Sequence, residues 1–324
     1  LQASLDRLRQ LNTQDIQPQW HHDAEETSLC ELFQTPIATQ WAIAPLNTRK
    51  HIAWDKGRHI LWRYQSITIP TDLHGYPLQG LILRLALTWW ADDAQIYIDG
   101  QLVQSGDLFE CFTRLCLSES VVPGQVFQVA IRLVSPGHDN GALVNSQLIY
   151  ELPTQSPTPE PSFVADELTV LATLEPTSQT AIESALEQLE WNSLQHTSNT
   201  HKPSTQHRAD DHRHTHSQQH TSAKTHEFQQ SLSNLRRTLL PFSEKLKQRT
   251  IQCVGHAHLD MAWLWPIEDT WDAAERTFRS ILNLQKDFPE LTYTHSSPAL
   301  FEWVENNRPD LFHQIQQKVE EGSW

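Results

Sequence analysis

The 324-residue sequence has a shortage of positive charge, few cysteines and no long apolar run. Its 24 Lys and Arg residues against 39 Asp and Glu residues give a formal net charge of -15, which argues against nucleic acid or an anionic membrane as a partner. No apolar run reaches the ~18–20 residues that a membrane-spanning helix needs. The four cysteines lie at irregular spacing and form neither a disulfide framework nor a Cys-x-x-Cys metal pair. We therefore expect reduced, buried thiols in a cytoplasmic protein.

The sequence also lacks a methionine at its first position. It begins at Leu1, its single methionine is Met261, and it ends at Trp324 just after a helix-like pattern. No basic, apolar and small-residue signal opens the chain, although a signal that had been removed would leave no trace. We therefore expect the sequence to be a fragment of a longer protein with several domains.

Residues 41–152 carry the pattern of short β-strands. Leucines alternate with other residues over positions 81–87 and form one strand face. The dipeptide Asp99-Gly100, between two strand-like runs, is a strong signal for a two-residue hairpin turn. Short strands at this spacing predict a β-sandwich with a jelly-roll-like arrangement. Before it, residues 1–40 are expected to be a helical or irregular segment, because leucines recur there at helical spacing.

Two neighbouring aromatic side chains of the β region, Trp89 and Trp90, could stack on a sugar ring. Aromatic residues are more often buried in a core, so this pair alone decides nothing. The pair leaves open an alternative for the whole chain, namely a non-catalytic carbohydrate-binding β domain.

The composition changes twice after the β region. Residues 153–194 begin with four prolines among serines and threonines, which marks an extended linker, and continue into helical patterns. Residues 195–227 contain almost no apolar side chain, so they bury too little surface to offset chain entropy, and we expect a disordered insertion. Its histidines suit metal binding, but a low-complexity loop explains them without any chemistry. These histidines are His196, His201, His207, His212, His214, His216, His220 and His226.

Residues 228–324 alternate between helical and strand-like patterns and predict the N-terminal part of an α/β domain. Strands separated by helices imply a parallel sheet with right-handed crossovers. Ligands bind at the carboxyl ends of such strands. Asp269 or Thr270 is the expected cap of the first helix that follows the first strand. The expected elements are a strand over 250–254, a helix over 271–288, a strand over 291–294, and helices over 299–305 and 309–321.

The end of the first expected strand carries three polar side chains, His256, His258 and Asp260, at every second position. Alternate side chains of an extended chain point the same way. Imidazole and carboxylate are suitable ligands for a borderline metal such as zinc. Spacing alone supports a metal site and an exposed polar turn equally, because a metal site needs three or four protein ligands and this segment offers at most three.

A longer string around these residues resembles a known family. It reads Gly-His-Ala-His-Leu-Asp-Met-Ala-Trp-Leu-Trp-Pro, then Arg-Thr-Phe at 276–278 and Ser-Ser-Pro-Ala-Leu-Phe-Glu-Trp at 296–303. The string resembles the start of the catalytic domain of retaining alpha-mannosidases of glycoside hydrolase family 38, over about residues 250–324. The resemblance implies that the chain is the N-terminal part of such an enzyme, truncated within the catalytic domain, and that its partner is a mannose-containing oligosaccharide.

The resemblance also implies roles for particular residues. His258 and Asp260 match the first two of four zinc ligands, two histidines and two aspartates, and Trp263 matches a tryptophan that lines the sugar site. A ligand role does not carry over to His256, so we expect it either to orient a ligand or to be a turn residue bonded to backbone. His295 stands where many relatives carry glutamine, which puts a role for it in doubt.

The mechanism that the resemblance implies needs residues beyond this segment. Retaining glycosidases use two carboxyl groups, one as nucleophile and one as acid/base. In the family, an aspartate nucleophile, the acid/base and the other two zinc ligands all follow the matching segment. We therefore expect no catalytic residue in this chain, weak zinc binding and no activity of the chain alone. A different metal-dependent hydrolase with a His-x-His strand end stays open, as does a homo-oligomeric state.

Overall fold

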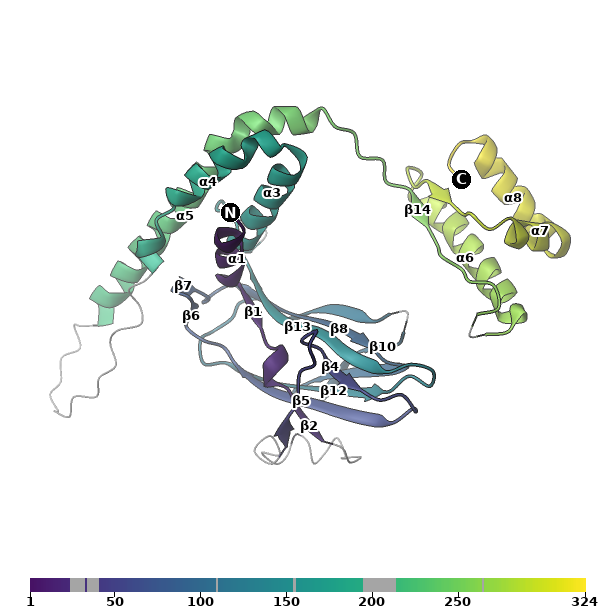
Figure 1. Ribbon diagram of the computed structural model, residues 1–324, viewed down its shortest axis with the longest axis horizontal. Helices are drawn as coiled ribbons and strands as arrows, with labels where there is room; N and C mark the ends of the chain where they lie inside the picture. The colour runs from purple at the N-terminus through teal and green to yellow at the C-terminus, as the bar shows by residue number, and fades with distance from the viewer. Residues whose placement is uncertain (24–32, 34–40, 109, 154–155, 195–213, 264) are drawn as a thin grey trace. The chain divides into compact units, whose positions relative to one another are not determined.

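The computed structural model describes residues 1–23, 33, 41–108, 110–153, 156–194, 214–263 and 265–324 (Figure 1). The chain divides into two compact units, Leu1–Leu246 and Lys247–Trp324. Within the described residues, every helix is too short or too polar to cross a membrane. The two units are described separately below.

The first unit is built around two antiparallel sheets (Figure 1). One has the strand order β1-β13-β8-β11, with β4 also paired to β13, and the other has the order β10-β9-β12-β5-β2-β3. The predicted β-rich character of this region is therefore confirmed, and its sheets are antiparallel; the jelly-roll-like sandwich over 41–152 stays a prediction. In the first sheet the strands are β1 Thr13–Asp15, β4 Ile52–Trp54, β8 Ile82–Trp90, β11 Phe112–Ser118 and β13 Gly141–Glu151. In the second sheet they are β2 His21–Asp23, β3 Ala42–Ile43, β5 Ile60–Thr68, β9 Asp93–Ile98, β10 Gln101–Gly106 and β12 Val126–Val134; a small hairpin pairs β6 Asp72–Leu73 with β7 Tyr76–Pro77.

The sequence pattern of these strands explains the core. Alternate residues of β8, from Leu83 to Trp89, are buried, while the residues between them are half-buried. The predicted hairpin turn is confirmed, because Asp99 and Gly100 have φ values of 49° and 82° between β9 and β10. Trp89 is only 1% exposed, so its ring belongs to the core and cannot serve as a sugar platform.

The N-terminal segment is part of the β unit, which corrects the expected separate segment over 1–40. After α1 (Gln2–Gln10), β1 pairs with β13 and β2 pairs with β5, so the segment adds one strand to each sheet. Helix α1 packs against α3 (Pro161–Leu174), where Arg9 Nη2 lies 3.0 Å from Asp166 Oδ1. Residues beyond Asp23 up to the tryptophan at 41 lie largely outside the described residues.

Helices follow the β region, as predicted for the end of 153–194. Helix α3 begins at Pro161, α4 spans Gln179–Glu187, and α5 spans His214–Lys247. Residues 195–213 of the expected insertion lie outside the described residues. The disorder expected up to 227 stays a prediction for residues 195–213, whereas the backbone from His214 onward is helical and belongs to α5. The buried face of that helix consists of Phe228, Leu232, Leu235 and Leu239.

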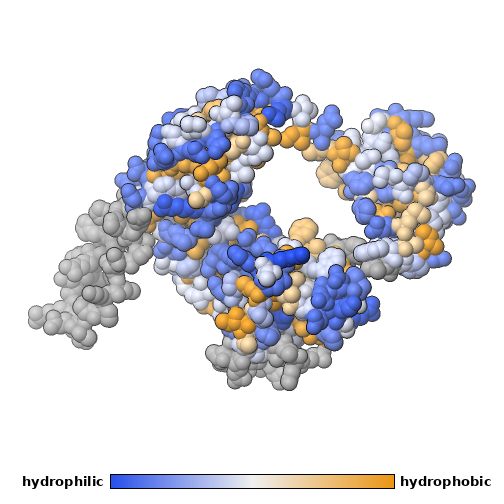
Figure 2. All heavy atoms as spheres, viewed as in Figure 1, coloured by the Kyte–Doolittle hydropathy of each residue, from blue (hydrophilic) through white to orange (hydrophobic). Residues whose placement is uncertain are grey.

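The second unit contains three helices and one parallel strand pair within its described residues. Strand β14 pairs with β15 in the register Gly255↔Tyr293 and His256↔Thr294. A larger parallel sheet stays a prediction. Hydrophilic side chains cover much of the visible surface of this unit, with hydrophobic patches between them (Figure 2). The elements are β14 Gly255–His256, α6 Ile267–Asp287, β15 Tyr293–Thr294, α7 Pro298–Asn307 and α8 Pro309–Glu320.

Several predicted boundaries of the second unit are wrong. The strand expected over 250–254 is absent from that described stretch, whose Ile251 is 84% exposed, because hydrogen-bonded pairing with β15 begins only at Gly255. Helix α6 begins at Ile267, directly after Pro266, and not at residue 271. Thr270 therefore lies inside the helix and does not cap it. The two helices expected near the C-terminal end are confirmed as α7 and α8.

The predicted burial of the thiols is also wrong. The described cysteines, Cys111, Cys116 and Cys253, are in no disulfide, and Cys116 and Cys253 are exposed. Cys253 is exposed because it lies in the same uncovered stretch as Ile251. Cys30 lies outside the described residues.

Candidate functional site

The loop between β14 and α6 brings two of the predicted site residues together. The Nε2 atom of His258 lies 2.9 Å from Oδ1 of Asp260. Their side chains are 80% and 43% exposed, respectively, so both can be reached from solvent. The residues follow the strand end directly, since β14 ends at His256. The sequence argument that the two polar groups face the same side therefore agrees with the geometry.

His256 is held by backbone on the neighbouring strand. Its Nδ1 lies 3.0 Å from the carbonyl oxygen of Thr294 on β15. A carbonyl oxygen only accepts, so Nδ1 carries the hydrogen and donates it. Of the two expectations for His256, the backbone-bonded turn residue is the one that this contact matches.

Trp263 presents its ring to solvent. It is 58% exposed and lies edge-on to Trp265, with ring centroids 5.7 Å apart. The residue before it, Ala262, has a φ of 50°, a backbone conformation that non-glycine residues seldom adopt. The turn at Ala262 thus places an aromatic face outside the loop, where a flat ring can pack on the C–H face of a sugar.

Thr270 of α6 holds this loop through hydrogen bonds of its side chain, a role that sequence reasoning missed. It is 1% exposed, and its Oγ1 accepts hydrogen bonds from Ala262 N (3.2 Å) and Trp265 Nε1 (3.0 Å). The same hydroxyl lies 3.4 Å from the carbonyl oxygen of Asp260, to which it donates. The available signal was its place in line with Ala274 on the buried stripe of α6, where a polar residue needs partners.

Replacing Thr270 with valine is expected to loosen this loop. The substitution keeps the shape but leaves the Ala262 and Trp265 donors without their acceptor, which costs about 1–2 kcal/mol of the free energy of unfolding of the second unit. Hydrogen exchange followed by mass spectrometry, on peptides covering 260–270, measures the loss. Thr277→Val on the same helix is the matched control, and equal exchange in both variants would contradict the assigned role.

His295 lies on the other side of the motif and is partly buried. Its Nδ1 is 3.0 Å from the carbonyl oxygen of Ala257, and its ring stacks on His256 with centroids 5.8 Å apart. Burial lowers the pKa of His295 below its ordinary value, and the nearby His256 and His258 add to that direction. The imidazole is therefore neutral around neutral pH.

The donor set suits zinc but is incomplete within the described residues. No group of three or more His, Cys, Asp or Glu side chains comes together there as a metal site would require. His258 Nε2 and Asp260 Oδ1 are close enough to contact one ion, because zinc bonds to such atoms are about 2.0–2.2 Å long. Two such donors are fewer than the three or four protein ligands that a zinc site needs.

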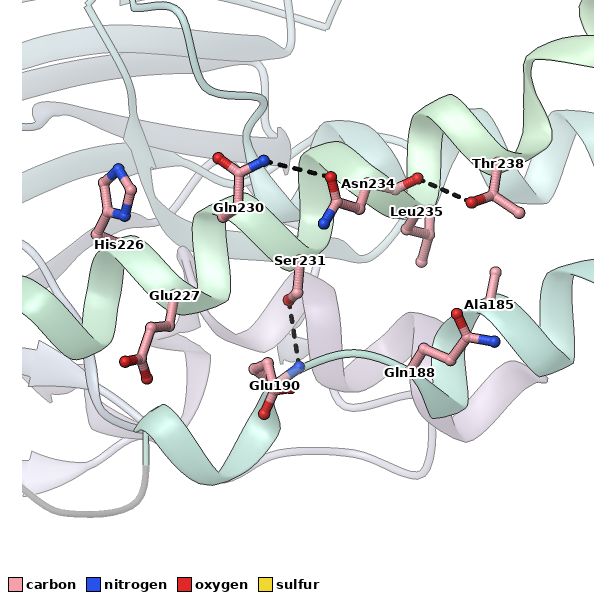
Figure 3. A pocket seen from close by; sticks show the side chains of 10 residues that line it. All are labelled: Ala185, Gln188, Glu190, His226, Glu227, Gln230, Ser231, Asn234, Leu235 and Thr238. Carbon is pink, nitrogen blue, oxygen red and sulfur yellow. Dashed lines mark hydrogen bonds between the residues drawn. The ribbon is translucent and has the colours of Figure 1, made fainter.

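Neither His258 nor Asp260 lines the two cavities described next. In the first unit a cavity of about 480 Å³ lies between α4 and α5, where Glu190 N donates to Ser231 Oγ at 3.2 Å (Figure 3). Four of its polar side chains, Gln230, Ser231, Asn234 and Thr238, bond to one another or to backbone. In the second unit an open cleft of about 350 Å³ is lined by His295, Ser296, Pro298, Phe301, Glu302, Glu305 and Phe312.

Comparison with known proteins found a family that the second unit resembles. Residues 248–324 match the model of the glycosyl hydrolases family 38 N-terminal domain. This segment is therefore similar to the N-terminal domain of that family. The chain is 31% identical to alpha-mannosidase G of Dictyostelium discoideum over 77 residues, which are 24% of this chain and 7% of that protein. It is 37% identical to alpha-mannosidase 2C1 of Homo sapiens over 70 residues, 22% of this chain and 7% of that protein.

The match to relatives is confined to part of each protein. The chain spans about 7% of the length of these curated relatives. Among solved structures, beta-glucuronidase 2 of Bacteroides uniformis is 15% identical and covers 44% of this chain and 18% of its own, with a TM-score of 0.34. The family 38 segment contains His258, Asp260, Trp263 and Thr270, the residues that build the loop described above.

Proposed function

We propose that this protein acts as a zinc-dependent retaining alpha-mannosidase that hydrolyses terminal alpha-mannosides of oligosaccharides. The observation that carries the proposal is the match of residues 248–324 to family 38 together with the contact between His258 and Asp260. Relatives named alpha-mannosidase support the substrate class. The parallel pair of β14 and β15 supports the further proposal that these strands begin a larger parallel sheet.

Each residue of the loop has a part in this function. His258 and Asp260 hold the zinc ion, and when bound the ion supplies a Lewis-acid contact to hydroxyl groups of the sugar. The exposed ring of Trp263 packs against the C–H face of the mannose and orients it. Thr270 holds the backbone of Asp260 and Ala262, so that the carboxylate and the ring keep their places.

The reaction also needs two carboxyl groups, a nucleophile and an acid/base. We propose that they, like the remaining zinc ligands, are not among the 324 residues of this chain. This chain alone then holds zinc weakly and does not turn over mannosides. The exposed and unpaired Cys116 and Cys253 are compatible with a reducing compartment, and we propose that the protein acts in the cytoplasm.

The product of the complete reading frame that encodes this chain is expected to hydrolyse aryl alpha-mannosides. Treatment with a chelator abolishes the activity and zinc restores it, while the 324-residue chain is inactive under the same conditions. Hydrolysis is measured by release of the aryl group, with aryl beta-glucuronides and aryl esters as control substrates. Full activity of the short chain, or turnover of esters without turnover of mannosides, would contradict the proposal.

A further inference from the structure

His256 and His295 form a reciprocal clasp between the two strands of the family 38 segment. His256, on β14, donates from Nδ1 to Thr294 O on β15 at 3.0 Å. His295, just after β15, donates from Nδ1 to Ala257 O just after β14, also at 3.0 Å. The two rings stack with an interplanar angle of 21°. A histidine from each strand thus donates a hydrogen bond to the backbone of the other.

The clasp continues the strand pairing where backbone pairing stops. The parallel register runs Gly255↔Tyr293 and His256↔Thr294, and its next step would be Ala257 opposite His295. At that step a side-chain donor takes the place of a backbone N–H and satisfies the Ala257 carbonyl. The Ala257 carbonyl lies in the peptide plane that joins Ala257 to His258, so a bond that holds this carbonyl also holds that plane and the Cα of His258.

The His295 ring is itself held firmly. It lies edge-on to Phe278 of α6 at 5.3 Å and to Phe301 of α7 at 5.9 Å between centroids, and it stacks on Tyr293 at 6.5 Å. Its Nε2 is buried and has no hydrogen-bond partner. With Nδ1–H fixed on Ala257 O, the ring stays in a single tautomer and a single orientation.

We propose that His295 is a positioning residue for the metal site: its Nδ1–H bond to Ala257 O aims His258 at the point that Asp260 also faces. The inference rests on the proposed function, and it concerns a residue whose role the sequence left in doubt. The backbone bond of His256 has the same role, because His256 is the other half of the clasp.

Zinc binding by the full chain tests the inference once the histidine-rich stretch from His196 to His226 no longer competes for the metal. In the parent variant, the eight histidines from His196 to His226 are replaced by glutamine, so that they cannot bind the metal. On this parent, His295→Phe keeps an aromatic ring but removes the donor. His295→Asn keeps an amide N–H near the position of Nδ1 but removes the ring. His313→Phe, on the exposed face of α8, is the matched control.

The expected results separate the donor from the ring. His295→Phe weakens zinc binding about tenfold, the low end of what residues behind metal ligands contribute. His295→Asn and His313→Phe stay within about threefold of the parent. Hydrogen exchange of peptides covering 256–262 is faster in His295→Phe than in His295→Asn. If His295→Phe does not fold, His295→Leu replaces it, since leucine and asparagine have similar shapes and differ in the donor.

Two outcomes overturn the inference. If the Phe and Asn variants both bound zinc as tightly as the parent and exchanged at the same rate as the parent, the donor would have no role. Equal weakening by both variants would show that the ring acts through packing alone. The proposed function fails differently: His258→Ala would then leave the zinc affinity of the parent unchanged. In that case faster exchange at 256–262 in His295→Phe would still support the clasp, and unchanged exchange would refute it.

Discussion

Replacing His258 with alanine is expected to weaken zinc binding by this chain about 100-fold, which corresponds to ~2.7 kcal/mol of binding free energy. The reason is that His258 Nε2 and Asp260 Oδ1 lie 2.9 Å apart, and no third His, Cys, Asp or Glu side chain joins them among the described residues. Removing one leaves a single carboxylate, a weak ligand by itself for a borderline metal. The affinity is measured by competition with a chromophoric chelator, in the variant whose eight histidines from His196 to His226 are glutamine.

Asp260→Asn provides a graded comparison for this result. The amide keeps an oxygen ligand but loses the negative charge, so the expected weakening is about tenfold, smaller than for His258→Ala. The control is His313→Ala, because that histidine is exposed on α8. Equal affinity in the parent and in His258→Ala would contradict the assignment, since zinc would then be bound by other groups.

Replacing Phe278 with alanine is expected to unfold the second unit while leaving the first one folded. Phe278 is fully buried, and its ring contacts Phe301 at 5.3 Å, Trp324 at 5.4 Å and His295 at 5.3 Å between centroids. Truncating a buried phenylalanine costs about 3–5 kcal/mol. A core of this size supplies little more stability than that. The expected result is therefore loss of cooperative unfolding in Lys247–Trp324.

Hydrogen exchange resolved by peptide distinguishes the two units. Peptides from α6, α7 and α8 should exchange as in an unfolded chain, whereas peptides from β8 and β12 should keep their protection. Phe288→Ala is the control, because Phe288 is 53% exposed and its truncation removes little buried surface. Retained protection of α6 in Phe278→Ala would contradict the view that this aromatic cluster holds the unit together.

The strand faces and the hairpin turn could be predicted because each depends on residues that are close together in the sequence. The alternation from Leu83 to Trp89 fixed one face of β8 in the core, and Asp99-Gly100 could adopt the left-handed conformations that a tight hairpin needs. At the site, the spacing of His258 and Asp260 predicted that their side chains face the same way. These inferences need only the residues themselves and their immediate neighbours.

The features that sequence reasoning missed depend on partners far along the chain. The apolar run at 250–254 has the composition of a strand, but Ile251 is exposed because pairing with β15 begins only at Gly255. From sequence alone Thr270 is a good candidate for a helix cap. The helix begins earlier, directly after Pro266, and the hydroxyl of Thr270 bonds to the loop instead. The role of His295 depends on the register of two strands that lie 38 positions apart in the sequence.

Binding of one zinc ion by both His258 and Asp260 is the central feature of the proposed site. Anomalous scattering at the zinc edge, from crystals of the zinc-loaded chain, tests this claim most directly. The predicted result is a zinc peak about 2.0–2.2 Å from both His258 Nε2 and an Asp260 carboxylate oxygen. Zinc bound elsewhere in the chain, with the His258 imidazole still hydrogen-bonded to Asp260, would contradict it.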